Sequence, residues 1–299
     1  MIKHFIDIDN FSLRELDLIL STAKKFKKNN TRYEKLFNNK SLGLLFQKES
    51  TRTRLSFSIG MQKLGGSVIE LDLKAIGFGK RESEEDILKT LSCYIDCLMI
   101  RNNNHKKIQY YASLNVLPII NGLSDCSHPC QILADIFTLK EKLGKLSNKT
   151  ICWIGDYNNV LRSLIQIQHL YLFQLNIVMP KKILLKNILK INNTKHSKIK
   201  FTDNIKNGVM KSDSVMTDAW VSMGEKNIKK KSFFKNYQVN NNVMKLAKKN
   251  AVFMHCLPAH RGEEVSNNVI DGYQSIVWLQ AKNRMYVQQA ILNYIINKK

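Results

Sequence analysis

Short apolar runs typical of buried strands alternate with segments of helical spacing along most of the chain. In the first half, the expected strands are 41–46, 68–73, 97–100 and 116–120, and the expected helices are 84–95, 129–143 and one from Thr51 to the glycine pair at 65 and 66. Successive parallel strands need a crossover connection, which is usually a helix. The alternation therefore predicts an α/β fold with parallel β-sheets flanked by helices.

A helix precedes the first strand. Apolar residues between Leu13 and Phe26 recur at helical spacing, and Ser12 is followed three residues later by Glu15, the pattern of a capping box. The chain is therefore expected to open with a helix whose start is fixed by its own side chains.

The second half repeats the alternation after a polar segment at 144–149. Its expected strands are 151–154, 175–179, 198–201, 214–217, 252–255 and 276–278, with a last helix at 283–296. Hydrophobic residues make up 44% of the 299 residues, enough for two cores. We expect a first domain at 1–145, a second at 146–280 and a C-terminal helix at 281–299 that packs back on the first.

Charge and cysteine content exclude several classes of protein. Lys and Arg number 47 against 24 Asp and Glu, a net charge of +23, but the lysines are scattered and lack interleaved aromatics, so a dedicated nucleic-acid partner is not expected. A basic surface of this kind can steer an anionic substrate. The six cysteines show no C-x-x-C spacing, and no run approaches about 18 uncharged apolar residues. We expect a cytoplasmic protein without a membrane segment.

The sequence Ser50-Thr51-Arg52-Thr53-Arg54 stands between an expected strand and an expected helix. Hydroxyls, guanidinium groups and unpaired backbone N–H groups at a helix N-terminus are suited to a phosphate. A serine N-cap followed by exposed helical arginines explains the same residues equally well.

Two further polar positions follow strands of the first half. His128-Pro129-Cys130-Gln131 opens a helix, and by itself His128 fits a buried imidazole or, with Cys126 and Cys130, a metal site. We expect no metal, because three ligands within five residues at a helix start have poor tetrahedral geometry. Arg101 ends a strand, where a parallel sheet faces its ligand.

Four more motifs lie in the second half. They are Gly155-Asp156-Tyr157-Asn158-Asn159, Asp218-Ala219-Trp220-Val221-Ser222-Met223-Gly224, the run from His255-Cys256-Leu257-Pro258 to Val265, and Asn283-Arg284-Met285. The first lacks G-x-G-x-x-G, which argues against a dinucleotide. Taken singly, Trp220 and Met223 fit a core and Pro258 fits a loop. Taken in order, the motifs resemble the aspartate/ornithine transcarbamoylase family, and the resemblance runs from about Phe5 to Ile296.

The resemblance implies transfer of a carbamoyl group from carbamoyl phosphate to the δ-amine of ornithine, giving citrulline and phosphate in arginine metabolism. It implies a homotrimer without metal or organic cofactor. The residues that it assigns to carbamoyl phosphate are Ser50, Thr51, Arg52, Thr53, Arg101, His128, Gln131 and Arg284. Gln131 would accept from the carbamoyl NH2, and Arg101, His128 and Arg284 would face the carbonyl oxygen.

On the acceptor side, the resemblance assigns Asp218 to the α-ammonium of ornithine. Asn159, Ser222 and Met223 would hold the amino-acid head group, while Cys256 and the Leu257 carbonyl would face the δ-amine. Arg101, His128, Cys256 and Arg284 are thus the expected catalytic residues. Aspartate-using members read His-Pro-Leu-Pro-Arg where this chain has the residues around Cys256.

Several positions depart from the family pattern, namely Gly77, Tyr157, Arg162, Leu279 and Gln280. None of them belongs to the Ser50-Thr51-Arg52-Thr53-Arg54 motif. They leave open an acceptor such as putrescine or a modified ornithine, and a noncatalytic relative that binds anions.

Overall fold

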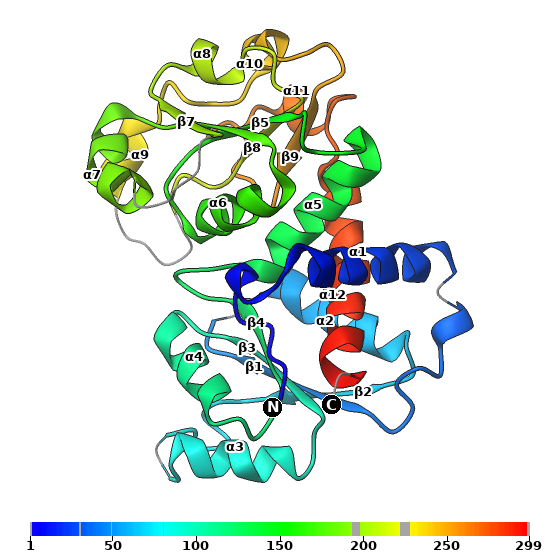
Figure 1. The fold of residues 1–299 in the computed structure, drawn as a ribbon. Coiled ribbons are helices and arrows are strands. Elements are labelled where there is room, and N and C mark those ends of the chain that lie inside the picture. The colour runs from blue at the N-terminus through cyan, green and yellow to red at the C-terminus, as the bar shows by residue number, and fades with distance from the viewer. Residues whose placement is uncertain are drawn as a thin grey trace. The chain divides into compact units, whose positions relative to one another are not determined.

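The computed structural model describes residues 2–29, 31–48, 50–79, 81–192, 198–221 and 228–297 (Figure 1). It divides into two compact units, Met1–Phe137 with Lys282–Lys299 and Thr138–Ala281. No helix in the described part of the chain combines the length and apolar character that a membrane span requires.

The first unit is built on a four-stranded parallel sheet of order β2-β1-β3-β4. Its strands are β1 (Ser41–Phe46), β2 (Ser67–Leu71), β3 (Cys97–Arg101) and β4 (Ile119–Leu123). Its helices are α1 (Leu13–Lys28), α2 (Thr51–Gln62), α3 (Glu84–Ser92), α4 (His105–Ser113), the first part of α5 (Pro129–Leu143) and most of α12 (Val277–Asn297). Since all four strands run in one direction, their carboxyl ends lie at one edge of the sheet.

The second unit has a five-stranded parallel sheet of order β7-β6-β5-β8-β9. Its strands are β5 (Thr150–Ile154), β6 (Gln174–Val178), β7 (Ile199–Thr202), β8 (Ser214–Thr217) and β9 (Val252–His255). Its helices are α6 (Asn159–Tyr171), α7 (Lys181–Asn192), α8 (Ile205–Val209), α9 (Ile228–Phe233), α10 (Asn241–Leu246) and α11 (Asn267–Ile270). The predicted α/β class with parallel sheets is thereby confirmed.

The local helix signals hold in the structure. The Ser12 side chain accepts from the Glu15 N–H, and the Glu15 side chain accepts from the Ser12 N–H, so the capping box of α1 is present. The last helix belongs to the first unit for most of its length, where Gln289 Nε2 donates to the Gly60 carbonyl oxygen over 3.0 Å. The predicted return of the C-terminal helix is therefore confirmed.

One strand prediction is wrong. Residues 276–278 form no strand, because α12 begins at Val277; Ser275 makes a single parallel bridge to Phe253, and pairing stops there. A short apolar run fits the start of an amphipathic helix as well as a strand, and only its neighbours decide.

Two other elements differ from expectation. The strand expected at 116–120 is β4 at Ile119–Leu123, displaced because Pro118 has no N–H to give to a ladder. The helix α4 was not predicted, although Asn104 before it is an N-cap whose side chain accepts from the Lys107 N–H.

Candidate active site

The first unit places the anion motif at the N-terminus of α2. Ser50 is the N-cap, and its Oγ accepts from the Thr53 N–H over 3.4 Å and donates to Thr53 Oγ1 over 2.9 Å. Register pairs Phe46 at the end of β1 with Arg101 at the end of β3. The sheet thereby carries the motif and Arg101 to the same edge.

Thr53 Oγ1 is the centre of a buried polar cluster in this unit. It accepts from Arg284 Nη2 over 2.7 Å and from Arg101 Nη1 over 3.4 Å. Arg284 Nη1 also donates to Gln131 Oε1 over 2.9 Å, and Gln131 Nε2 donates to Asp135 Oδ1 over 2.8 Å. The side chains come from α2, β3, α5 and α12, four elements that are far apart in the sequence.

Positive charge is concentrated in this cluster. Burial, followed by the neighbouring charges of Arg284 and Arg52, lowers the pKa of Arg101 to about 10. Burial and the charges of Arg284 and Arg101 hold the pKa of His128 well below its ordinary value. At neutral pH the guanidinium of Arg101 is therefore charged and the imidazole of His128 is neutral. Buried guanidinium groups that repel one another are stabilised by an anion.

The two arginines of the motif have different environments. Arg52 is half-buried and acts electrostatically on Arg101, as described above. Arg54 Nε lies 3.2 Å from a carboxylate oxygen of Glu70, and its guanidinium lies over the Phe46 ring. Ser50 is the N-cap that one interpretation expected, but neither arginine is fully exposed; Thr51, in the first turn, is exposed.

The cysteines near His128 do not form a metal-binding group with it. Cys130 Sγ donates to the Asn121 carbonyl oxygen over 3.4 Å, and burial raises the pKa of its thiol to about 12. Within the described residues, the side chains close enough to hold an ion are Asp218 with His255 and Cys256, and His260 with Glu263 and Glu264.

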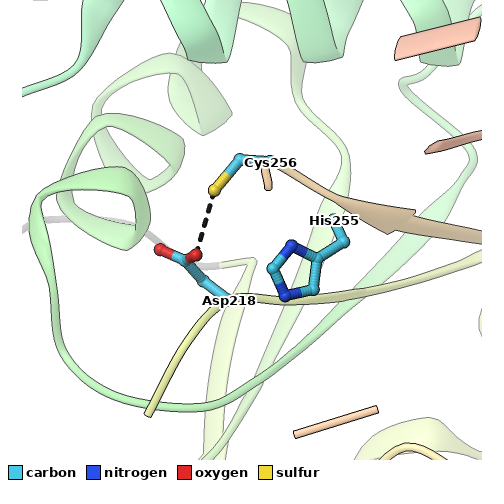
Figure 2. A group of neighbouring side chains, drawn as sticks. All are labelled: Asp218, His255 and Cys256. Carbon is cyan, nitrogen blue, oxygen red and sulfur yellow. Dashed lines mark hydrogen bonds between the residues drawn. The ribbon is translucent and has the colours of Figure 1, made fainter. Parts of the chain in front are cut away.

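In the second unit, a carboxylate and a thiol face each other at neighbouring strand ends. Asp218 follows β8 and Cys256 follows β9, and these strands pair in parallel with Thr217 opposite His255. Figure 2 shows Cys256 Sγ directed at Asp218, to whose Oδ1 it donates over 3.0 Å. Ser222 and Met223 lie outside the described residues.

Asn158, which sequence reasoning passed over in favour of Asn159, makes a close contact to Asp218. Its Nδ2 donates to Asp218 Oδ2 over 2.7 Å, and its Oδ1 accepts from the N–H groups of Val160 and Leu161 as the N-cap of α6. Asn159 is half-buried in the first turn. The available sequence signal was an asparagine one position before the expected start of the helix, where an N-cap stands.

His255 lies beside this pair with both ring nitrogens engaged. Nδ1 accepts from the Leu257 N–H over 2.9 Å, and Nε2 lies 3.1 Å from Glu264 Oε1. Binding a metal through His255 would therefore cost one of these contacts. Gln280, one of the departures from the family pattern, accepts from the His255 N–H over 3.0 Å.

The remaining departures have simple surroundings. Tyr157 is half-buried; burial raises its pKa, and the charge of Arg162 opposes that rise. Gly77 has a φ of +63°, and a Cβ there would lie 2.8 Å from Arg81 Cδ, so both conformation and space favour glycine. Leu279 is half-buried.

Two parallel α/β units, one with a buried arginine cluster at its strand ends, define an enzyme that binds a small phosphorylated substrate. The family model described as the aspartate/ornithine carbamoyltransferase carbamoyl-P binding domain matches residues 3–141, and the model for the Asp/Orn binding domain matches residues 147–295. The chain belongs to the aspartate/ornithine carbamoyltransferase family, and it is a carbamoyltransferase.

Individual relatives span the whole chain. The ornithine carbamoyltransferase of Ruthia magnifica subsp. Calyptogena magnifica is 45% identical over 301 residues, covering 99% of this chain and 100% of that protein. The one from Brucella suis biovar 1 is 41% identical, covering 100% and 97%. The solved structure of the anabolic ornithine carbamoyltransferase from Campylobacter jejuni has a TM-score of 0.89 at 32% identity and covers all of both chains.

Proposed function

We propose that this chain transfers the carbamoyl group of carbamoyl phosphate to the δ-amine of L-ornithine, giving L-citrulline and phosphate. The observation that carries the proposal is the buried Thr53 hydroxyl, which accepts from both Arg101 and Arg284 at the N-terminus of α2. With the Ser50 hydroxyl, which also donates to Thr53 Oγ1, three donor groups are directed at one point, an arrangement suited to an oxyanion.

In this proposal, Ser50, Thr51, Arg52 and Thr53 bind the phosphate and stabilise the charge that it gains as the C–O bond breaks. Arg101, Arg284 and neutral His128 donate to the carbonyl oxygen. Gln131 Oε1, which accepts from Arg284, would accept from the carbamoyl NH2 as well, since a carbonyl oxygen has two lone pairs.

The acceptor side is assigned to Asp218, Asn159, Ser222, Met223, Cys256 and Leu257. The resemblance assigns Asp218 to the α-ammonium of ornithine. The 3.0 Å hydrogen bond from Cys256 to Asp218 instead favours one substrate group that contacts both side chains. Four carbon atoms separate the two nitrogens of ornithine, so we assign both side chains to the δ-amine. Cys256 orients that amine and is not proposed as a covalent nucleophile.

Ornithine is preferred over other acceptors because both curated relatives described above carry the name ornithine carbamoyltransferase. We propose arginine biosynthesis as the setting, a cytoplasmic location and a homotrimeric assembly. We assign carbamoyl phosphate to 1–145 together with 281–299, and ornithine to 146–280. The family matches at 3–141 and 147–295 support the boundary near residue 145, and the grouping of Lys282–Lys299 with the first compact unit supports the assignment of 281–299.

A citrulline assay with purified protein tests the proposal. With carbamoyl phosphate present, we expect citrulline from ornithine and no carbamoylated product from putrescine or aspartate. Binding of carbamoyl phosphate without product from any of the three amines would indicate a noncatalytic relative, and product from putrescine alone would reassign the acceptor.

A further inference from the structure

Glu264 is a fully buried carboxylate in the loop after β9. Its Oε1 accepts from the His260 N–H over 2.6 Å and lies 3.1 Å from His255 Nε2. Burial alone would raise the pKa of Glu264, but the bonds from His255 and the His260 backbone outweigh it, and the pKa is lowered. Glu264 is therefore an ionised group that can only accept hydrogen bonds.

These contacts fix the proton on His255. Because Glu264 can only accept, Nε2 of His255 must carry a hydrogen and donate it. Because Nδ1 accepts from the Leu257 N–H, Nδ1 must carry none. His255 is thus the neutral Nε2–H tautomer.

Two hydrogen bonds anchor the backbone on either side of Cys256, and the tautomer of His255 determines one of them. Leu257 has a φ of +60°, a left-handed conformation that non-glycine residues rarely adopt, and its N–H is held by His255 Nδ1. On the other side, the His255 N–H is held by Gln280 Oε1. Cys256 stands between these two anchored residues in the sequence, and its thiol points at Asp218 (Figure 2).

We propose that Glu264 is a positioning residue for the amine acceptor: it holds His255 in the tautomer that anchors Leu257, and so places the Cys256 thiol and the Leu257 carbonyl for the incoming amine. This inference rests on the proposed function, since it presumes that an amine binds at Cys256 and Leu257. Glu264 touches no substrate; it acts through His255.

Kinetics of three variants test the role of Glu264. Glu264→Ala should raise the KM for ornithine at least tenfold and leave the KM for carbamoyl phosphate within twofold. Glu264→Gln keeps an oxygen that can accept from both donors and should restore the ornithine KM to within about threefold. Glu263→Gln is the matched control: Glu263 pairs with Lys231 over 2.8 Å, and its loss should change neither KM.

Two substitutions of His255 separate its two contacts. The side-chain oxygen of asparagine is as many bonds from Cα as Nδ1 of histidine is. The side-chain nitrogen of glutamine is as many bonds from Cα as Nε2 of histidine is. His255→Asn can therefore still accept from Leu257, whereas His255→Gln can reach only Glu264. We expect the smaller increase in ornithine KM from His255→Asn.

A ¹⁵N spectrum of the histidine side chains in the full-length protein gives a readout that does not depend on activity. We expect a protonated Nε2 and an unprotonated Nδ1 at His255, assigned by its loss in His255→Gln. A protonated Nδ1, or an unchanged ornithine KM in folded Glu264→Ala, overturns the positioning role. Absence of citrulline from the wild-type protein instead overturns the proposed function.

Discussion

Single side chains of the first unit gain their function from burial. Arg101 and Arg284 are charged groups withdrawn from water, which is costly unless hydrogen bonds and a counter-charge compensate. Thr53 supplies one shared acceptor, and the phosphorylated substrate would supply the counter-charge. We therefore expect a bound anion to stabilise the cluster.

Arg52→Ala should weaken carbamoyl phosphate binding about 100-fold, because a charge-assisted contact in a buried site is worth on the order of 2–3 kcal/mol. The KM for carbamoyl phosphate measures the effect. Arg54→Ala is the comparison: its partners are Glu70 and the Phe46 ring, so a change below about threefold is expected. Near-normal kinetics of Arg52→Ala would remove Arg52 from the site.

His128 should make the protein less stable in mild acid. Its pKa is held well below the ordinary value of 6.5 by burial and by Arg284 and Arg101, whereas the unfolded chain regains that value. As pH falls below 6.5, the unfolded state binds a proton that the native state does not. The contribution of neutral His128 to the free energy of unfolding is therefore complete above pH 6.5 and declines below it by up to about 1.4 kcal/mol per pH unit. The free energy of unfolding, measured with urea, should differ less between pH 7.5 and pH 5.5 for folded His128→Asn than for the wild type.

At the scale of the element, α1 illustrates how a local signal acquires a tertiary role. Glu15 completes the capping box of α1 and also accepts from Lys3 and from the Tyr294 hydroxyl of α12. A motif that sequence alone predicts thus also joins the first and last helices of the first unit.

Glu15 should make stability fall in strong acid. Burial alone would raise its pKa, but bonds from Tyr294, Ser12 and Lys3 together lower it to about 2 from 4.5. Its contribution is complete above pH 4.5 and is lost as pH falls toward 2, because the unfolded state protonates first. Glu15→Gln should reduce the free energy of unfolding at pH 7 by about 1–2 kcal/mol, discounted for partial exposure. The same substitution should also make the free energy of unfolding, measured with urea, depend less on pH in acid. An unchanged pH dependence would contradict the stabilising role of Glu15.

At the scale of the molecule, one surface of the first unit supports the proposed assembly. Leu55 and Ile59, one helical turn apart on α2, are 53% and 40% exposed. Exposed apolar side chains that cluster mark an interaction surface more often than isolated ones do.

Light scattering should give a mass three times the 34.6 kDa of the chain. Glutamate at both Leu55 and Ile59 should shift the protein toward the single-chain mass, since charge buried in an apolar interface is costly. Leu172→Glu in the second unit, also exposed, is the control and should leave the mass unchanged. A single-chain mass for the wild type would contradict the trimer.

Local patterns in the sequence determined the parallel α/β class, the capping box of α1 and the Ser50 turn at the start of α2, because each depends on residues a few positions apart. The helix α4 was equally local, and its Asn104 cap was overlooked.

Only the tertiary structure decided that residues 276–278 begin a helix, that Arg54 pairs with Glu70 while Arg52 acts on Arg101, and that Glu264 lies against His255. These outcomes depend on which side chains are brought together and removed from water. That information lies in the packing of distant segments, and no local pattern contains it.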